Sequence, residues 1–337
     1  MALVLFLMTY ILFLRALLLM KERRYRDFSM LWSPILLNGK GNKQDRPPRI
    51  NYADRFSFLI LWNTLREGKD GDVKIRDWMN SVAIETGIDR VAIRLLKKRS
   101  IRKKLLAVVT LGQLRDKSQW EILYQMALSD HALLSLAAAQ ALARIDREAA
   151  VPIIVPLIVR RMDWPAAKVA SILGGIGPDL VAKPLADAIM EAPAEEMQRL
   201  IPYLETCHDA IALPVVHRIL NDPPHDKVIG PCLYVIGKFR DKNDLKLVRQ
   251  YLTHPRWHVR AHAAACLGRI GTKEDEAKLA ALLADPEWWV RYRAAQAIVD
   301  LSFSSLERIR QLKEYRHDRY ARDILEQVIV EKRLIRQ

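Results

Sequence analysis

Apolar residues recur three and four positions apart along most of the chain, and the alternation typical of strands is almost absent. Within residues 278–283 this spacing predicts a helix, which Asp285 and Pro286 then end because proline has no amide hydrogen to donate. A second helix is predicted over residues 290–298, where alanines allow two helices to approach closely. The pattern therefore predicts helical hairpins and an all-α fold.

The hairpin pattern repeats with a period of about 31 residues. Pro224, Val228, Ile236 and Gly237 recur as Pro255, Val259, Leu267 and Gly268, and in part as Pro286, Val290 and Ile298. A fixed period of this size is typical of stacked units, each of which buries its apolar face against its neighbours. Weaker matches upstream, at 111–114 and 173–177, extend the array. We therefore predict an α-solenoid of roughly six or seven units over residues 99–302.

The last units carry a recognisable motif. Residues 285–291, Asp-Pro-Glu-Trp-Trp-Val-Arg, and the alanine-rich residues 294–298 resemble the signature of HEAT repeats. The short period is similar to the HEAT-like subtype found in bilin lyases. The resemblance implies a ladder of ion pairs between an Asp before the proline and an Arg after the valine. Asp285, Arg260 and Arg291 fit this ladder, but His254 and Ile229 replace expected members, so we do not expect a continuous ladder.

The first twenty residues carry no charged side chain except Arg15. About twenty apolar helical residues cross a bilayer core, and no small-residue cleavage site follows them, which argues against a secretory signal. We predict a transmembrane anchor over residues 1–20, with the remainder on the cytoplasmic side because cations follow directly. Arg15 can snorkel to that side. The alternatives are that Arg15 pairs with an acidic residue of another subunit, or that the segment is a buried core helix.

Composition divides the rest of the chain. Glycines and prolines among polar residues 38–51 indicate a linker. The predicted parts are a basic juxtamembrane segment and linker (21–51), a helical N-terminal cap (52–98), HEAT-like repeats (99–302) and C-terminal capping helices (303–337). Three cysteines, Cys207, Cys232 and Cys266, argue against a disulfide framework and agree with a reducing compartment.

The net charge of +15 predicts an anionic partner. Residues 21–104 hold 21 Lys and Arg against 10 Asp and Glu, whereas residues 105–337 hold 32 against 29. The repeats are nearly neutral, which argues against a nucleic-acid groove along them. We expect the basic residues 21–104 to lie against anionic lipid instead. A solvated helix end is the alternative for residues 97–104. The candidate residues for anionic lipid or phosphate are Lys21, Arg23, Arg24, Arg26, Lys97, Lys98, Arg99, Arg102, Lys103 and Lys104.

Aromatic residues alternate with arginines near the predicted turns of the last repeats. Both types are favoured in binding hot spots, so we predict a surface that binds a partner protein. The alternative is that the tryptophans pack neighbouring repeats together. Single-stranded nucleic acid would use the same residues by stacking, but the neutral repeats argue against it. The predicted partner-binding residues are Trp257, Arg260, Trp288, Trp289, Arg291 and Tyr292.

His254, His258, His262 and Cys266 follow one another at intervals of four, and these residue types ligate zinc. Pro255, however, places His254 outside the helix, and Cys266 aligns with a packing position of the next repeat. We favour surface histidines and a buried thiol, with metal binding as the open alternative.

The chain carries no nucleophile elbow, phosphate-cradling glycine loop or His-Glu-x-x-His motif. We therefore predict no cofactor and no enzymatic activity.

Together these features predict a membrane-tethered scaffold or adaptor that binds a protein on the cytoplasmic face, as an accessory subunit of a membrane assembly. The partner is expected to be an integral or peripheral membrane protein, and no small-molecule substrate is expected. HEAT-like repeats also occur in bilin lyases and isomerases and in alkylpurine DNA glycosylases. The resemblance therefore leaves an enzyme of one of these types as an alternative, although lyases and repair glycosylases have no need of a membrane anchor. A nucleic-acid-binding solenoid recruited to the membrane is the other alternative, and the nearly neutral repeats argue against it.

Overall fold

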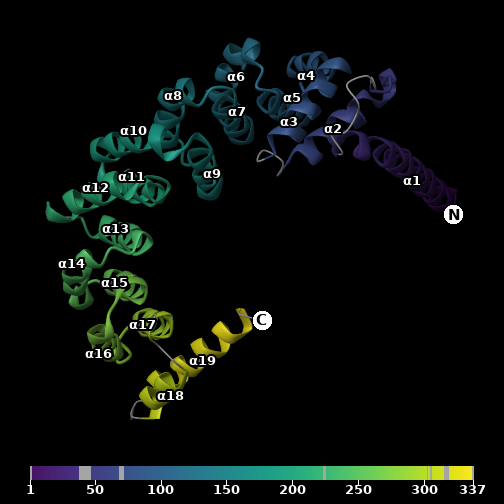
Figure 1. The fold of residues 1–337 in the computed structure, drawn as a ribbon. Helices are drawn as coiled ribbons and strands as arrows, with labels where there is room; N and C mark the ends of the chain where they lie inside the picture. Colours follow the sequence, from purple (N-terminus) through teal and green to yellow (C-terminus); the bar gives the residue numbers. More distant parts are fainter. Residues whose placement is uncertain are drawn as a thin grey trace. The chain divides into compact units, whose positions relative to one another are not determined.

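The computed structural model describes residues 2–37, 47–67, 72–222, 225–301, 303, 306–314 and 319–335. These residues form nineteen α-helices and five short 3-10 helices (η1 to η5), and the described part contains no strand (Figure 1). The predicted all-α fold class is thus confirmed. The chain divides into two compact units, Met1–Ala150 and Val151–Gln337. Pro224 and residues 38–46 of the predicted linker lie outside the described residues.

The first unit begins with a long helix packed on a group of shorter ones. It holds α1 (Ala2–Leu37), η1 (Tyr52–Asp54), α2 (Arg55–Arg66), α3 (Val73–Glu85), α4 (Ile88–Leu96), α5 (Ile101–Leu114), η2 (Lys117–Gln119), α6 (Trp120–Ala127) and α7 (Ala132–Ile145). The division between the units falls within α8 (Arg147–Arg160).

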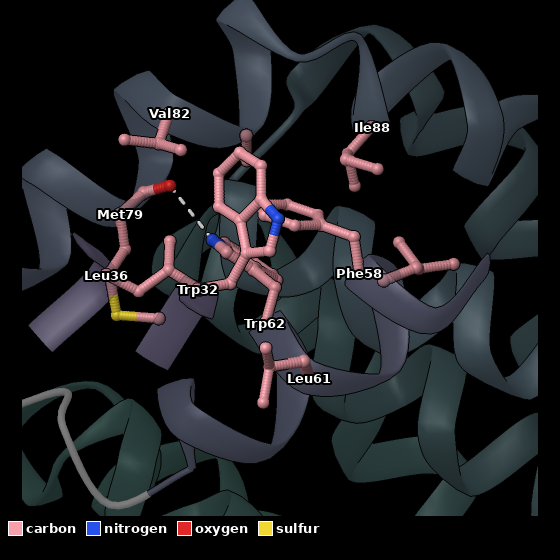
Figure 2. Close-up of a cluster of buried hydrophobic side chains, with 10 residues drawn as sticks. Trp32, Leu36, Phe58, Leu61, Trp62, Met79, Val82 and Ile88 are labelled. Atoms are coloured by element: carbon pink, nitrogen blue, oxygen red, sulfur yellow. Dashed lines mark hydrogen bonds between the residues drawn. The ribbon is translucent and has the colours of Figure 1, made fainter. Parts of the chain in front are cut away.

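The end of α1 belongs to the core of this unit. Trp32 and Leu36 are buried against α2 and α3, and Trp32 meets Phe58 edge to face with ring centroids 4.8 Å apart. Figure 2 shows the indole of Trp62 in the same cluster, where its Nε1 donates a hydrogen bond of 2.9 Å to the carbonyl of Met79. Burying each such side chain contributes about 1.5–3 kcal/mol, so α1 is fixed to the unit by its C-terminal part.

The beginning of α1 has a different environment. Its described apolar side chains are exposed, and Arg15 and the charged residues from Lys21 onward belong to the same helix. Taken over the residues that the structure describes, no helix has both the length and the apolarity needed to cross a bilayer. The predicted transmembrane helix is therefore not supported.

The second unit is a series of hairpins. It holds α9 (Ala166–Ile176), α10 (Pro178–Glu191), α11 (Ala194–Leu200), η3 (Ile201–Thr206), α12 (Asp209–Asn221), α13 (Asp226–Phe239), η4 (Lys242–Asp244), α14 (Leu245–Gln250), η5 (Tyr251–Thr253), α15 (Trp257–Ile270), α16 (Lys273–Leu282), α17 (Trp288–Asp300), α18 (Leu306–Glu314) and α19 (Arg319–Ile335). The second helices of successive hairpins, α13, α15 and α17, pack in order, and α19 packs on α17. In the first unit, α5 packs against α7 in the same way.

These second helices approach closely at one recurring position. A Cβ atom on Gly112 or Gly268 would lie 2.7 Å from the Cα of Ala141 or Ala297. Gly237 faces Cys266 at a wider spacing, because 3.5 Å between its Cβ position and the Cα of Cys266 is an ordinary van der Waals distance. The predicted role of Cys266 as a packing residue is thereby confirmed. A glycine facing a small residue sets the spacing between neighbouring repeats.

Candidate interaction surfaces

The tryptophans of the last repeats lie at the starts of two packed helices. Trp257 opens α15, while Trp288 and Trp289 open α17, and they remain 40%, 40% and 52% exposed. Trp288 stacks on Tyr292 with centroids 5.1 Å apart and an interplanar angle of 9°, and Trp289 meets Trp288 edge to face. Large exposed apolar side chains that gather in one place are typical of interaction sites. Trp288 and Trp289 therefore form a candidate contact surface, and Trp257 adds to it from the same position at the start of the adjacent helix α15, which packs on α17.

Arg260, which we predicted beside them, has an intramolecular role. Its guanidinium donates to both carboxylate oxygens of Asp285 at 2.7 and 2.8 Å, and to the carbonyls of His254 and Pro255. Burial alone would raise the pKa of Asp285, but hydrogen bonds from Arg260 and from the backbone amide of Glu287 outweigh it and lower the pKa. Arg260 thus joins consecutive repeats.

Arg291 and Tyr292 contact α19 as well as the repeat turn. Arg291 donates to the carbonyl of Asp285 at 3.0 Å, and its guanidinium lies over the ring of Tyr320. The hydroxyl of Tyr292 donates to Glu331 at 2.7 Å. The predicted set therefore divides into exposed tryptophans and residues that hold the repeats together, with the ring of Tyr292 contributing to both groups.

The ladder of ion pairs has members that the sequence analysis missed. Arg249 donates to both oxygens of Asp275 at 2.6 and 3.0 Å, and Asp275 also accepts from the backbone amide of Thr272. Arg308 pairs with the buried Glu276 at 2.9 Å. A Thr three residues before an Asp at a helix start is a recognisable capping signal, so Asp275 could have been found. The ladder is discontinuous, because His217 pairs with Asp244 at 2.6 Å in the preceding repeat.

The histidines and cysteines in and near α15 have separate environments. His254 accepts from the backbone amide of Arg256. Partial desolvation and the charge of Arg293 lower the pKa of His262, whose side chain keeps an exposed surface. Burial raises the pKa of the Cys266 thiol to about 12, and Cys207 and Cys232 are also buried and unbridged. Over the part of the chain that the structure describes, no three His, Cys, Asp or Glu residues are arranged to hold a metal ion.

The candidate cations of α1 line a hollow at the start of α2. Its volume is about 800 Å³, and Lys21, Arg24 and Arg26 lie on one side with Phe56 and Ile60 on the other. Arg24 donates to Asp54 at 2.7 Å, which joins α1 to η1. The hollow combines apolar side chains with three cations and with two carboxylates, those of Glu22 and Asp54.

A second basic surface surrounds the turn between α4 and α5. Lys97, Lys98, Arg99, Arg102 and Lys103 are exposed, Lys104 is half-buried, and none of the six forms an ion pair with a described residue. Three of them lie in the first turn of α5, where the helix dipole disfavours positive charge. Helix stability therefore does not explain their position.

A second hollow, of about 430 Å³, opens beside this turn. It is lined by Tyr52, Arg55, Phe56, Val91, Arg94, Leu95, Lys97 and Lys98. The sequence pattern did not indicate Arg55, because only the packing of α2 on α4 brings it to the lysines. Arg94 lies three and four residues before Lys97 and Lys98, so helical spacing could have indicated it.

Comparison with known proteins identifies the repeats. A family model described as HEAT repeats matches residues 213–299, which run from α12 into α17. No curated protein matches the chain. Among solved structures, an engineered protein is 16% identical with a TM-score of 0.32, covering 87% of this chain and 86% of its own. Human deoxyhypusine hydroxylase in complex with glycerol is 17% identical with a TM-score of 0.31, covering 84% and 99%. HEAT repeats are thus confirmed at residues 213–299, whereas the bilin-lyase subtype is not supported.

Proposed function

We propose that this chain is a membrane-tethered HEAT-repeat scaffold that binds a partner protein on the cytoplasmic face of a membrane, as an accessory subunit of a membrane assembly. The observation that carries the proposal is the beginning of α1. Between Val4 and Met20, thirteen large apolar side chains are 40% to 66% exposed. Full exposure of such a side chain costs about 1.5–3 kcal/mol relative to burial, and the partial exposure of these thirteen costs a corresponding share each. Another apolar phase is therefore expected to cover them.

Lipid is the covering that the neighbouring charges favour. Lys21, Arg23, Arg24 and Arg26 follow the apolar residues on the same helix. Each cation near an anionic bilayer surface contributes about 1 kcal/mol. In this arrangement the apolar residues enter the acyl layer, while the cations remain among the headgroups.

Vesicle flotation tests the tether. Deleting residues 2–20 leaves Trp32 and Leu36 in the core, so the truncated chain should keep its fold while it loses binding to vesicles that contain phosphatidylglycerol. Circular dichroism of the truncated chain controls for folding. Flotation of the truncated chain at the level of the full chain contradicts the tether.

The proposed contact surface for the partner is formed by Trp257, Trp288 and Trp289. Exposed tryptophans are among the residues that contribute most to protein interfaces. The near neutrality of the repeats favours a protein over nucleic acid as the partner. We propose a binding role without catalysis, in which the second unit holds the partner and α1 holds the scaffold at the membrane.

A further inference from the structure

We propose that the hollow between the start of α2 and the end of α4 is a phosphate-binding site formed by Arg55, Arg94, Lys97 and Lys98. The phosphate belongs either to the headgroup of an anionic phospholipid or to a small soluble phosphate ester. The inference rests on the proposed function only for the lipid source, because a soluble ester requires no tether. The inference goes further in assigning a defined site to a defined group.

All the charged side chains that line the hollow are positive. Four of its eight residues are cations, and the other four are Tyr52, Phe56, Val91 and Leu95, so no carboxylate lies among them. Arginine and lysine side chains that converge on one small space raise the local positive potential. They also offer several N–H donors to the same anion, which is the usual basis of phosphate recognition.

Arg55 provides an independent sign of a missing acceptor. Its Nε is buried and has no hydrogen-bond partner among the residues that the structure describes, while its guanidinium lies 5.5 Å from the centroid of the Tyr52 ring. A buried donor without a partner is destabilising, and donors to charged groups form the strongest hydrogen bonds in proteins. An anion bound beside Arg55 would satisfy this donor.

A backbone hydrogen bond orients the side chain of Arg94 and leaves other donors of its guanidinium available. Its Nε donates to the carbonyl of Arg90 at 3.2 Å, which orients the guanidinium and leaves the two Nη groups without a described partner. Lys97 and Lys98 are exposed at the end of α4. The site thus combines two arginines, each held by a neighbouring group, with two adaptable lysines.

The surroundings fit a phosphate that carries an apolar or aliphatic group. Tyr52 and Phe56 are exposed at the rim, and Phe56 also lines the 800 Å³ hollow beside α1. A phospholipid headgroup in the smaller hollow would therefore have apolar surface beside it on the side of α1.

Binding measurements on matched variants test the site. Inorganic phosphate and glycerol 3-phosphate are titrated into the full chain in neutral detergent by calorimetry. The same chain is mixed with phosphatidylcholine vesicles, with and without phosphatidylglycerol. The variant Lys97→Ala/Lys98→Ala removes two charges that line the hollow. The control Arg102→Ala/Lys103→Ala removes two exposed charges from the same basic surface outside the hollow.

We expect the first double variant to weaken the binding of inorganic phosphate and glycerol 3-phosphate by roughly tenfold or more, since two charge-assisted contacts are lost. In these two titrations the control should stay within about twofold of the full chain, because its two cations lie outside the hollow and are screened surface charges. Binding of glycerol 3-phosphate identifies a soluble ester as a ligand, and a response confined to phosphatidylglycerol vesicles identifies the lipid. Equal losses in both variants, or no binding of any probe, overturn the proposal. Phosphate binding by a chain that never floats refutes the tether and leaves this site intact.

Discussion

Trp257, Trp288 and Trp289 remain partly exposed, while Arg260, which lies one turn after Trp257 on α15, donates hydrogen bonds to Asp285 and to two backbone carbonyls. The difference follows from chemistry. A guanidinium needs several acceptors when it is partly buried, and the repeat turn supplies them, whereas the three indoles at the starts of α15 and α17 keep 40% to 52% of their surface exposed. Removal of an arginine here therefore tests stability, and removal of a tryptophan tests binding.

Replacing all three tryptophans with alanine should weaken capture of the partner by roughly tenfold or more, since buried tryptophans dominate interface energies. Helix content should stay constant. Crosslinking and purification from native membranes identify the protein that accompanies the full chain, and the same capture is then measured for the variant. Met162→Ala, at another exposed apolar side chain, is the control. Undiminished capture by the triple variant would exclude these residues from the interface.

Asp285→Asn should lower the free energy of unfolding at pH 7 by about 3 kcal/mol, because it leaves the guanidinium of Arg260 without its counter-charge. The pKa of Asp285 is lowered in the folded chain, so its contribution is complete above the unfolded pKa of about 3.9. It is lost as the pH falls through the folded pKa. Urea unfolding at several pH values should show the two chains converging below about pH 4. A difference that does not depend on pH would contradict an ionic role.

At the level of helices, the contact between Gly268 and Ala297 sets the distance between α15 and α17. Alanine is normally the better helix former by about 1 kcal/mol, so Gly268→Ala would be stabilising if helix propensity decided. The new Cβ would lie 2.7 Å from the Cα of Ala297, however. Relieving this steric overlap requires a shift of the helix backbone, which is destabilising. We therefore expect destabilisation by about 1–3 kcal/mol.

Gly174→Ala is the matched control, because Gly174 lies in α9 with no atom within 4 Å of its Cβ position. It should be neutral or slightly stabilising. Thermal unfolding of both variants shows whether each substitution raises or lowers the stability of the fold. If Gly268→Ala proves as stable as Gly174→Ala, the glycine does not set the helix spacing.

The sequence was sufficient to predict the hairpins, because their contacts recur at a fixed period and involve neighbours in the chain. Cys266 could be placed by its alignment with Ala297, and Arg260 by the motif around Asp285. The end of α1 could not be placed in the same way. Trp32 meets Phe58, Trp62 and Met79 through contacts that belong to no repeat. The hollow at Arg55 and Arg94 was missed for the same reason, since no local pattern joins residues on two non-consecutive helices.

At the level of the whole molecule, the two proposed roles fall in different compact units. The exposed part of α1 and the four cations of the phosphate site belong to Met1–Ala150, while the three tryptophans belong to Val151–Gln337. Each unit has its own buried core. A chain cut between α7 and α8, after Asp146, leaves every described helix whole.

Residues 1–146 should float with anionic vesicles and bind phosphate without capturing the partner, whereas residues 147–337 should capture the partner and stay off the vesicles. The reason is physical: the proposed tether is the exposed surface of α1, and the proposed contact surface for the partner is formed by tryptophans on α15 and α17. Flotation, calorimetry and co-purification of the two fragments measure this division, with circular dichroism showing that each keeps its helices. Capture that requires both fragments together would mean that the partner contacts both units, and the scaffold would then act as one surface.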